Sequence, residues 1–579
     1  MLDELKALPR VQALVVGAGI NGISAFRELA LQGIDVLLVD RGDFCGACSS
    51  APSSMIHGGL RYLENGELAL VRESLRERDA LLRNASHMVR PLPTTVPIQH
   101  VFSGLLNAAY GVLGLRTAPA ERGAVAVKAG LTLYDRMARE HRAMPRHALR
   151  GRTETLRLWP DLPPTVRFSA TYHDAWISFP ERLGIEMVND VVEAHPWALA
   201  VNHLAVTDRD GDRILLTDAL TGAGFAVTAD VVLNATGAWV DEVNALLAAD
   251  GAAPEPMVGG TKGSHLILDN AALLRALNGH MIYFENVDGR VCIVFPYLGR
   301  VLLGSTDIRV ERPGEVRCED EEVAYILKSL SYVFPGIPIA AEQIVYRYSG
   351  VRPLPRSAAS FTGRISRDHF VELVPGPPPT LCLVGGKWTT FRAFGAQAAD
   401  RALAILGVPR VASTENLAIG GGVGFPIDAA REAALVAGLA AEFGVTEARA
   451  AHAVARYGTD AGRVLAFCRD HADSCLADTG YSTAEIRYLV RREHARTLAD
   501  VAQRRTSLAI TGALSSAAIA ETAAVLADEL GWSPELAAAA ERDFRARLAR
   551  DHGLTEAILA ERDRPTTRSL ECALARRHG

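Results

Sequence analysis

A glycine-rich turn between two predicted strands defines the local fold of the first 40 residues. Residues 11–16 form an apolar, β-branched run, and Gly17-Ala18-Gly19-Ile20-Asn21-Gly22 follows it directly. Residues 23–32 are then typical of a helix, and residues 34–40 are typical of the next strand. This order predicts a βαβ unit, the building block of a Rossmann-like α/β domain.

The spacing of the glycines and of one acidic residue predicts what this unit binds. Gly17 allows the tight turn, Gly19 lets a pyrophosphate approach the backbone, and Gly22 lets helix and strand pack closely. The helix N-terminus faces the phosphates with unpaired N–H groups. Asp40 ends the second strand about twenty residues later, where a carboxylate binds ribose hydroxyls. The unit is therefore predicted to bind a dinucleotide, with NAD and FAD as alternatives.

Three later segments favour FAD. A serine-rich loop at residues 49–54 leads to a histidine and two glycines, and two further apolar strands end in the small-residue segments 235–237 and 385–386. Hydroxyl groups suit phosphate and ring contacts, and glycines permit close approach of the backbone to a flat ring. The predicted cofactor contacts are Gly17, Gly19, Gly22, Asp40, Ser49, Ser50, Ser53, His57, Gly58, Gly59, Ala235, Thr236, Gly237, Gly350, Gly386, Lys387, Thr389 and Thr390.

The length and the change of composition along the chain predict three domains. The chain has 579 residues, of which 49% are hydrophobic, enough for several buried cores. Residues 196–233 and 256–342 are rich in predicted strands, whereas alanine, arginine and glutamate dominate from about residue 425. We expect an α/β fold, or α+β when the whole chain is considered. It combines a Rossmann-like FAD-binding domain (10–98, 176–255 and 343–406), an antiparallel-sheet substrate domain (99–175 and 256–342) and an all-helical C-terminal domain (425–579).

Charge, cysteines and the N-terminal segment exclude several classes of protein. The net charge of −6 disfavours binding of nucleic acid. Eight scattered cysteines form no disulfide framework, and the Cys45-x-x-Cys48 spacing has no second ligand cluster, so no metal site is predicted. We expect no secretory signal and no transmembrane helix, because the chain has neither a signal-like N-terminus nor a long apolar run. The expected location is cytoplasmic, with the inner face of the cytoplasmic membrane as an alternative.

The motifs taken together resemble the FAD-dependent glycerol-3-phosphate dehydrogenases, within the superfamily that includes D-amino acid oxidase and glycine oxidase. The matching segments are GAGINGIS at 17–24, IHGGLRYLE at 56–64, NATGAWV at 234–240, KGSHLIL at 262–268, GSTDI at 304–308, YSGVRPL at 348–354, SRDH at 366–369, GGKWTTFR at 385–392 and the helical segment 491–510. The resemblance implies oxidation of sn-glycerol 3-phosphate to dihydroxyacetone phosphate, with hydride transfer to FAD and electrons passed to quinone.

The resemblance also implies the residues of the substrate site. In the family, the arginines and the lysine that match Arg61, Arg352, Arg367 and Lys387 line the pocket, and Tyr62 and His265 complete the expected substrate-binding set. A planar guanidinium suits a phosphate because it can bind two oxygens. The expected catalytic residues are His57, Arg61, Arg352 and Lys387, with His57 or Lys387 as the base that takes the hydroxyl proton. His57 is favoured because an ordinary histidine has a pKa near 6.5, and His265 is a second histidine candidate. The structural alternatives are ordinary ion pairs for the arginines and a packing role for the histidines.

Two departures from the family pattern concern the substrate. Ser54 replaces a lysine and Pro52 a serine in the loop before IHGG, and residues 178–182 replace an aspartate pair followed by Ala-Arg. A longer polyol phosphate, such as a tetritol phosphate, is therefore an alternative substrate. An oxidase that uses oxygen and a flavin-holding regulatory protein without turnover are the rival functions.

One segment suggests contact with a membrane. Residues 101–115 are apolar, and Lys128, Arg136, Arg139, Arg142 and Arg146 follow them. This pattern is typical of a monotopic attachment, and the alternative is a buried helix followed by a solvated basic one. A homodimer is also expected, with the C-terminal helices as a candidate interface.

Overall fold

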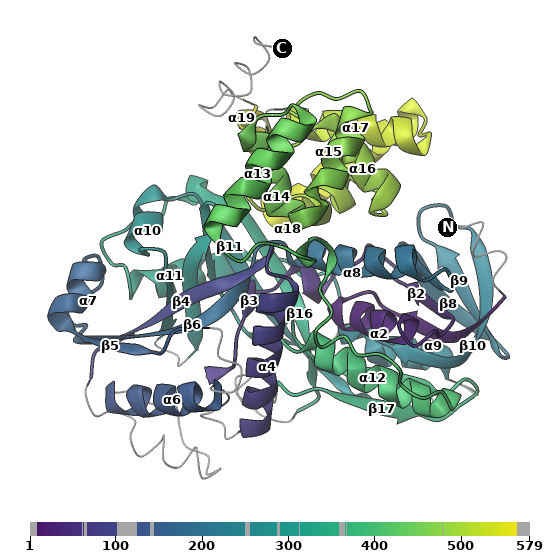
Figure 1. Ribbon diagram of the computed structural model, residues 1–579, viewed down its shortest axis with the longest axis horizontal. Helices are drawn as coiled ribbons and strands as arrows, with labels where there is room; N and C mark the ends of the chain where they lie inside the picture. Colours follow the sequence, from purple (N-terminus) through teal and green to yellow (C-terminus); the bar gives the residue numbers. More distant parts are fainter. Residues whose placement is uncertain are drawn as a thin grey trace.

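The expected βαβ unit lies in the middle of a mostly parallel sheet in the computed structural model (Figure 1). β1 (Arg10–Val16) and β2 (Val36–Val39) are parallel neighbours, and α2 (Ile20–Ala30) connects them. The helix begins at Ile20 rather than at residue 23, with the extended Gly19 as its N-cap. The structure describes residues 9–60, 62, 67–100, 124–138, 144–248, 255–286, 290–311, 313–357, 365, 367–477 and 479–563.

The first sheet has the strand order β17-β18-β10-β1-β2-β7, and the β8–β9 hairpin extends from β10. The helices α2, α8 and α12 bury one face, while the hairpin and α9 cover the other. β1, β2, β7, β10 and β18 pair in parallel, so the carboxyl ends of β1 and β10 lie at one edge. The further bounds are β7 (Ala198–Val201), β8 (Leu204–Asp210), β9 (Arg213–Asp218), β10 (Gly224–Asn234), β17 (Phe370–Val374), β18 (Thr380–Val384), α8 (Pro180–Ala194), α9 (Val240–Leu247) and α12 (Phe391–Leu406).

The second sheet has the strand order β15-β11-β14-β13-β12-β4-β6-β3, with β16 on β11 and β5 on β6. Its pairs are antiparallel except β4 with β12, as expected for a substrate domain built from hairpins. The helices α7, α10 and α11 pack on it. The bounds are β3 (Met55–Ile56), β4 (Val89–Ile98), β5 (Ala148–Gly151), β6 (Phe168–Ile177), β11 (Val258–Leu268), β12 (Met281–Glu285), β13 (Val291–Tyr297), β14 (Arg300–Gly304), β15 (Ile308–Val310), β16 (Ile344–Pro355), α7 (Arg152–Leu158), α10 (Ala271–Ala276) and α11 (Asp320–Ser331).

The two sheets do not follow the expected domain boundaries strand by strand. β3, β4 and β16 were expected in the FAD-binding part, and all three lie in the second sheet. β16 pairs along most of β11, so hydrogen bonding of the backbone assigns it to that sheet. The division of the chain into domains therefore stays a prediction at these strands. α4 (Leu68–Asn84) and α6 (Ala124–Met137) pack beside the second sheet, and the apolar segment 101–115 lies outside the described residues.

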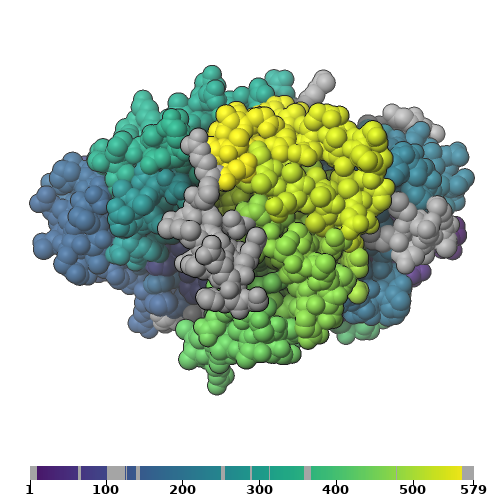
Figure 2. Space-filling view, turned by 90° about the horizontal axis from the view of Figure 1, so that it is seen from above, coloured from purple at the N-terminus to yellow at the C-terminus, as the bar shows by residue number. Residues whose placement is uncertain are grey.

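The C-terminal part is helical, as its composition predicts, and it lies over both sheets (Figures 1 and 2). Side chains of Ser, Thr or Asp cap the N-termini of six of its described helices: α13, α14, α16, α17, α18 and α19. The bounds are α13 (Ala429–Phe443), α14 (Glu447–Tyr457), α15 (Ala461–Arg469), α16 (Thr483–Arg492), α17 (Ser516–Leu530), α18 (Pro534–His552) and α19 (Glu556–Glu561). Among the described helices, none is both long and apolar enough to cross a bilayer.

Candidate active site

A cavity of about 330 Å³ lies between the two sheets. Its walls come from residues 48–62, from β11, β13 and β16, and from the segment after β18. Among the residues expected from the sequence, the cavity is lined by Ser53, His57, Gly59, Tyr62, His265, Gly350, Arg352, Arg367, Gly386, Lys387 and Thr389. The other expected cofactor residues lie outside this lining, and Arg61 lies outside the described residues.

The glycine fingerprint has the close packing that its spacing predicts. A Cβ on Gly22 would lie 1.9 Å from the Gly17 carbonyl oxygen, and one on Gly17 would lie 2.7 Å from that of Ala235. Gly17 also has a φ of +97°, which L side chains rarely adopt. The Asp40 carboxylate accepts hydrogen bonds from the backbone N–H groups of Ala18 (2.7 Å) and Gly42 (2.8 Å). Burial raises the pKa of Asp40 above its ordinary value, although these two hydrogen bonds oppose the rise.

The three serines of the loop that were expected to contact the cofactor have different surroundings. The Ser49 hydroxyl accepts a hydrogen bond from the Ile20 N–H (3.0 Å), at the start of α2, where the fingerprint predicts phosphates. The Ser50 hydroxyl donates to the nearby Ala47 carbonyl (2.8 Å). Ser53 lies 2.8 Å from Nε2 of His265 and lines the cavity. The loop therefore connects the fingerprint to the cavity.

Gly58 fits where no other residue can. Its N–H donates to Asp174 (3.0 Å), and a Cβ there would lie 2.1 Å from the Tyr134 hydroxyl oxygen. The same Asp174 oxygen accepts from the Tyr134 hydroxyl (2.8 Å) and from Arg78 (3.2 Å). A buried polar cluster therefore fixes the backbone just before Gly59, which lines the cavity with a φ of +80°.

The remaining small residues approach the same region from other strands. Ala235, Thr236 and Gly237 follow β10 beside the fingerprint, where Thr236 donates to Asn234 (2.6 Å). A Cβ on Gly350 would lie 2.7 Å from that of Ala51. The Thr390 hydroxyl, at the start of α12, is buried and has no hydrogen-bond partner among the described residues.

Lys387 lies at the cavity with its amine held by neutral groups. Its Nζ donates to the Ser74 hydroxyl (2.8 Å) and lies 4.3 Å from the centre of the Tyr62 ring. Burial lowers the pKa of Lys387 to about 7, although the nearby Glu73 carboxylate acts in the opposite direction. A substantial fraction of the amine is therefore neutral at neutral pH and able to accept a proton.

The two expected histidines are both neutral at neutral pH. Burial, reinforced by the charge of Lys387, lowers the pKa of His57 to about 4. Burial and the charge of Arg352 lower that of His265 to about 3. The backbone N–H of His57 donates to the Thr389 hydroxyl oxygen (3.2 Å). The His265 ring stacks on the Tyr348 ring, with 5.1 Å between ring centres. A group with so low a pKa is a weak base, so these rings are suited to hydrogen bonding more than to proton abstraction.

Two of the expected arginines converge on one acidic residue. Arg352 lies 3.1 Å and Arg367 3.4 Å from the carboxylate of Asp307. Arg352 also donates to the Ser305 hydroxyl (3.3 Å), and a Cβ on Gly263 would lie 2.0 Å from its guanidinium. Asp307 thus holds two guanidinium groups at the cavity wall, which is an arrangement suited to a phosphate.

Several residues at the site were not assigned a role from the sequence. Asp307 is part of the GSTDI segment, so motif position offered a signal for it, whereas Asp174 lies in none of the matching segments. Ser74 and Glu73 lie on α4, far from any glycine motif, and nothing in the sequence connects them to Lys387. Their proximity is set by how α4 packs beside the cavity.

Neither the cysteine pair nor the acidic clusters of the described residues form a competing centre. Cys45 is fully buried, and burial raises its pKa well above the ordinary value, so its thiol is not activated. Asp43, His203 and Asp500 come close enough to hold a metal ion. However, arginine and backbone N–H groups already bind the two carboxylates.

Two family profiles match most of the chain. The profile of the family described as "FAD dependent oxidoreductase" matches residues 12–392, and that described as "C-terminal domain of alpha-glycerophosphate oxidase" matches residues 412–537. A Synechocystis protein named glycerol-3-phosphate dehydrogenase is 32% identical, over 90% of this chain and 93% of its own length. One of that name from Mycobacterium leprae is 30% identical, over 90% and 85%.

A solved structure shares the fold along nearly the whole chain. The glycerol-3-phosphate dehydrogenase from Bacillus halodurans, complexed with FAD, superposes with a TM-score of 0.74 at 20% identity. The match covers 95% of this chain and 97% of that one. At this identity the likeness concerns the fold, and it includes the helical C-terminal part.

Proposed function

Because this chain belongs to the family of FAD-dependent oxidoreductases, we propose that it oxidises sn-glycerol 3-phosphate to dihydroxyacetone phosphate. The observation that carries the proposal is the pairing of a partly neutral lysine with two arginines around one cavity. The names of the relatives and the likeness of the motifs support the same substrate.

The residues present fit FAD at both ends. Gly17 and Gly22, where a Cβ would meet the chain's own backbone, let the turn and helix pack closely, and the Asp40 carboxylate lies beside this turn, as a dinucleotide site requires. The Thr390 hydroxyl and the Asn21 side-chain oxygen are buried without a partner among the described residues, which leaves hydrogen-bonding capacity for a cofactor. When bound, FAD supplies the acceptor for the hydride that leaves carbon 2 of the substrate.

The chain's own residues bind the substrate and move its proton. Arg352 and Arg367 bind the phosphate dianion, with Asp307 keeping the two guanidinium groups in place. Lys387 takes the proton of the carbon-2 hydroxyl as the C–H electron pair departs and the carbonyl forms. His57, neutral at neutral pH, orients that oxygen by hydrogen bonding.

Anaerobic bleaching of the flavin tests this function. Adding sn-glycerol 3-phosphate without oxygen should bleach the flavin absorbance of the wild-type holoenzyme. Bleaching should be as fast in the control variant Lys328→Met, which changes an exposed lysine of α11. In Lys387→Met it should be far slower. If Lys387→Met and His57→Gln both keep a near-normal rate of flavin reduction, neither residue is the base. A protein that is never bleached is a flavin-holding protein without this activity.

The same experiment decides among phosphorylated polyols. Among the departures from the family pattern, Pro52 lines the cavity, whereas Ser54 and residues 178–182 do not. Running tetritol phosphates beside glycerol 3-phosphate compares the second-order rate constants for reduction. We expect glycerol 3-phosphate to be faster, and a preference for a tetritol phosphate would reassign the substrate while leaving the flavin chemistry intact.

We further propose that quinone accepts the electrons at a membrane surface. The exposed part of α6 carries Val125, Leu133, Lys128 and Arg136, a mixture of apolar and basic side chains suited to anionic lipid. Reoxidation by a soluble quinone should be faster than by air, and the protein should sediment with anionic vesicles in a salt-sensitive way. Rapid reoxidation by air alone would favour the oxidase, and full retention in the supernatant at low salt would exclude the membrane contact.

A further inference from the structure

The loop that follows β2 is held on one side by the fingerprint. Asp40 and Gly42 are tied together by the hydrogen bond from the Gly42 N–H to the Asp40 carboxylate (2.8 Å). The other Asp40 oxygen accepts from the Ala18 N–H (2.7 Å), and the Cys45 N–H donates to the Ala18 carbonyl (2.9 Å). The position of the ribose-binding carboxylate therefore depends on the conformation of residues 40–45.

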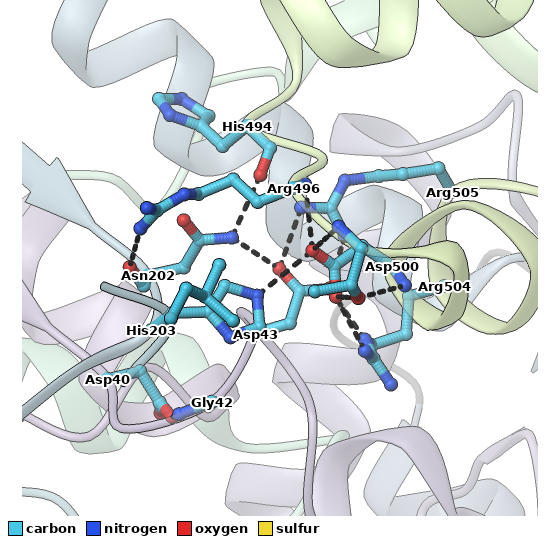
Figure 3. A network of polar contacts seen from close by, with 12 residues as sticks. Asp40, Gly42, Asp43, Asn202, His203, His494, Arg496, Asp500, Arg504 and Arg505 are labelled. Carbon is cyan, nitrogen blue, oxygen red and sulfur yellow. Dashed lines mark hydrogen bonds and ion pairs between the residues drawn. The ribbon is translucent and has the colours of Figure 1, made fainter. Parts of the chain in front are cut away.

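The same loop is held on its other side by Asp43. This residue is 2% exposed, and its carboxylate accepts from Arg505 twice, at 2.6 and 2.8 Å. It also accepts from Arg504 (2.5 Å) and from Asn202 (2.8 Å). Figure 3 shows these side chains converging on Asp43, next to Asp40 and Gly42. Both arginines belong to the C-terminal domain, so the contact joins two domains.

The C-terminal domain holds the two arginines in turn. Asp500 accepts from Arg504 (2.8 Å) and from His203 (3.0 Å), and Arg505 donates to the Glu493 carbonyl (2.8 Å). Burial raises the pKa of Asp43, but the charges of Arg505 and Arg504 outweigh it and keep that pKa below the ordinary value. The carboxylate is therefore ionised, and removing it leaves buried guanidinium groups without their partner.

We propose that Asp43 is a positioning residue for FAD, through which the C-terminal domain holds Asp40 in its ribose-binding place. Cofactor affinity then depends on a contact between two domains rather than on the Rossmann-like domain alone. The inference rests on FAD as cofactor and not on the identity of the polyol phosphate, so the two can fail separately.

Cofactor binding to the full-length apoprotein tests the proposal. Asp43→Asn keeps the shape of the side chain and removes its charge. Its dissociation constants for FAD and for ADP, which carries the same ribose end, should each rise by about tenfold or more. Arg505→Lys, which keeps a charge but loses the two-pronged contact, should give a smaller rise.

A double-mutant cycle separates positioning from loss of stability. If Asp43 acts through Asp40, Asp40→Ala with Asp43→Asn should bind FAD about as weakly as Asp40→Ala alone. Glu485→Gln is the matched control, since Glu485 is a buried carboxylate that pairs with Arg456 and Tyr457 inside the C-terminal domain. It should lower the melting temperature and leave FAD affinity within about twofold.

Three results would overturn the proposal. These are wild-type affinity in Asp43→Asn, fully additive losses in the cycle, and equal weakening by Glu485→Gln. If Asp43→Asn does not fold, Arg504→Gln carries the same measurements, because Arg504 lies at the edge of the network with its side chain 12% exposed. Wild-type FAD affinity in a folded Arg504→Gln would then count against the proposal.

Discussion

If Lys387 is the base, flavin reduction should depend on pH with a midpoint near 7. A lysine with the ordinary pKa of 10.5 would be neutral in about one molecule in three thousand at pH 7, whereas a pKa of about 7 makes about half of the amines neutral. Because only the neutral amine accepts the hydroxyl proton, the second-order rate constant should rise about tenfold per pH unit below the midpoint and level off above it.

Two neighbouring charges should move this midpoint in opposite directions. Burial raises the pKa of Glu73 itself to about 7, and in its ionised form this carboxylate favours the ammonium form of Lys387, so Glu73→Gln should shift the midpoint to lower pH. Arg367 disfavours the ammonium form, so Arg367→Gln should shift it to higher pH. Arg367→Gln should also weaken substrate binding, but the midpoint does not depend on that loss.

The measurement is anaerobic stopped-flow reduction of the FAD-saturated enzyme between about pH 5.5 and 9. Lys328→Met should keep the wild-type midpoint, and Lys387→Met should lose the inflection and show whatever dependence the substrate phosphate contributes. If the wild-type profile shows no inflection beyond that of Lys387→Met, the role passes to His57, whose pKa of about 4 lies below this range. Shifts of the same sign in Glu73→Gln and Arg367→Gln would refute the electrostatic reasoning.

Three further predictions concern the phosphate, the fingerprint and a buried acid. Arg352→Met should raise the KM for glycerol 3-phosphate by about ten- to a hundredfold, since the substitution removes the charged group proposed to bind the phosphate. An unchanged KM in steady-state assays would exclude Arg352 from the phosphate site. Gly22→Ala should abolish FAD retention, because its Cβ would meet the Gly17 carbonyl at 1.9 Å, and a purified Gly22→Ala protein with full flavin content would contradict this. Gly438→Ala inside α13 has open space around it and should raise the free energy of unfolding by about 0.5–1 kcal/mol, as measured by denaturant titration. Burial raises the pKa of Glu181 from 4.5 to about 8, so the folded state loses stability as pH rises between these values. The melting temperature of Glu181→Gln should therefore exceed that of wild type at pH 8.5, and the difference should shrink toward pH 5. A difference that does not change with pH would show that it does not come from the ionisation of Glu181.

The fold was predictable largely because local patterns carry it. A β-branched run followed by crowded glycines permits few alternatives to a βαβ turn, and the observed β1 and β2 lie within two residues of the expected strands. The helical C-terminal domain follows from its composition and its capping residues. The assignment of strands to sheets was less accessible, because β4 and β16 find their partners through contacts distant in the sequence.

The amino-acid sequence by itself determined the glycine turn and the types of residue that surround the cavity. Gly17, Gly22 and Asp40 act through backbone geometry within one βαβ unit, and periodicity and spacing describe that geometry. The cationic residues Arg352, Arg367 and Lys387 were recognisable by their motifs, and the fold gathers them around one cavity.

Only the tertiary structure decided the protonation state of these groups and which residues lie next to them. The pKa of Lys387 depends on burial beside α4, and Asp307 brings Arg352 and Arg367 together across separate segments. The contact of Asp43 with Arg504 and Arg505 spans more than 400 residues of chain. Desolvation and ion pairing depend on distances in space, and sequence spacing does not encode those distances once the chain has passed through two sheets and a helical domain.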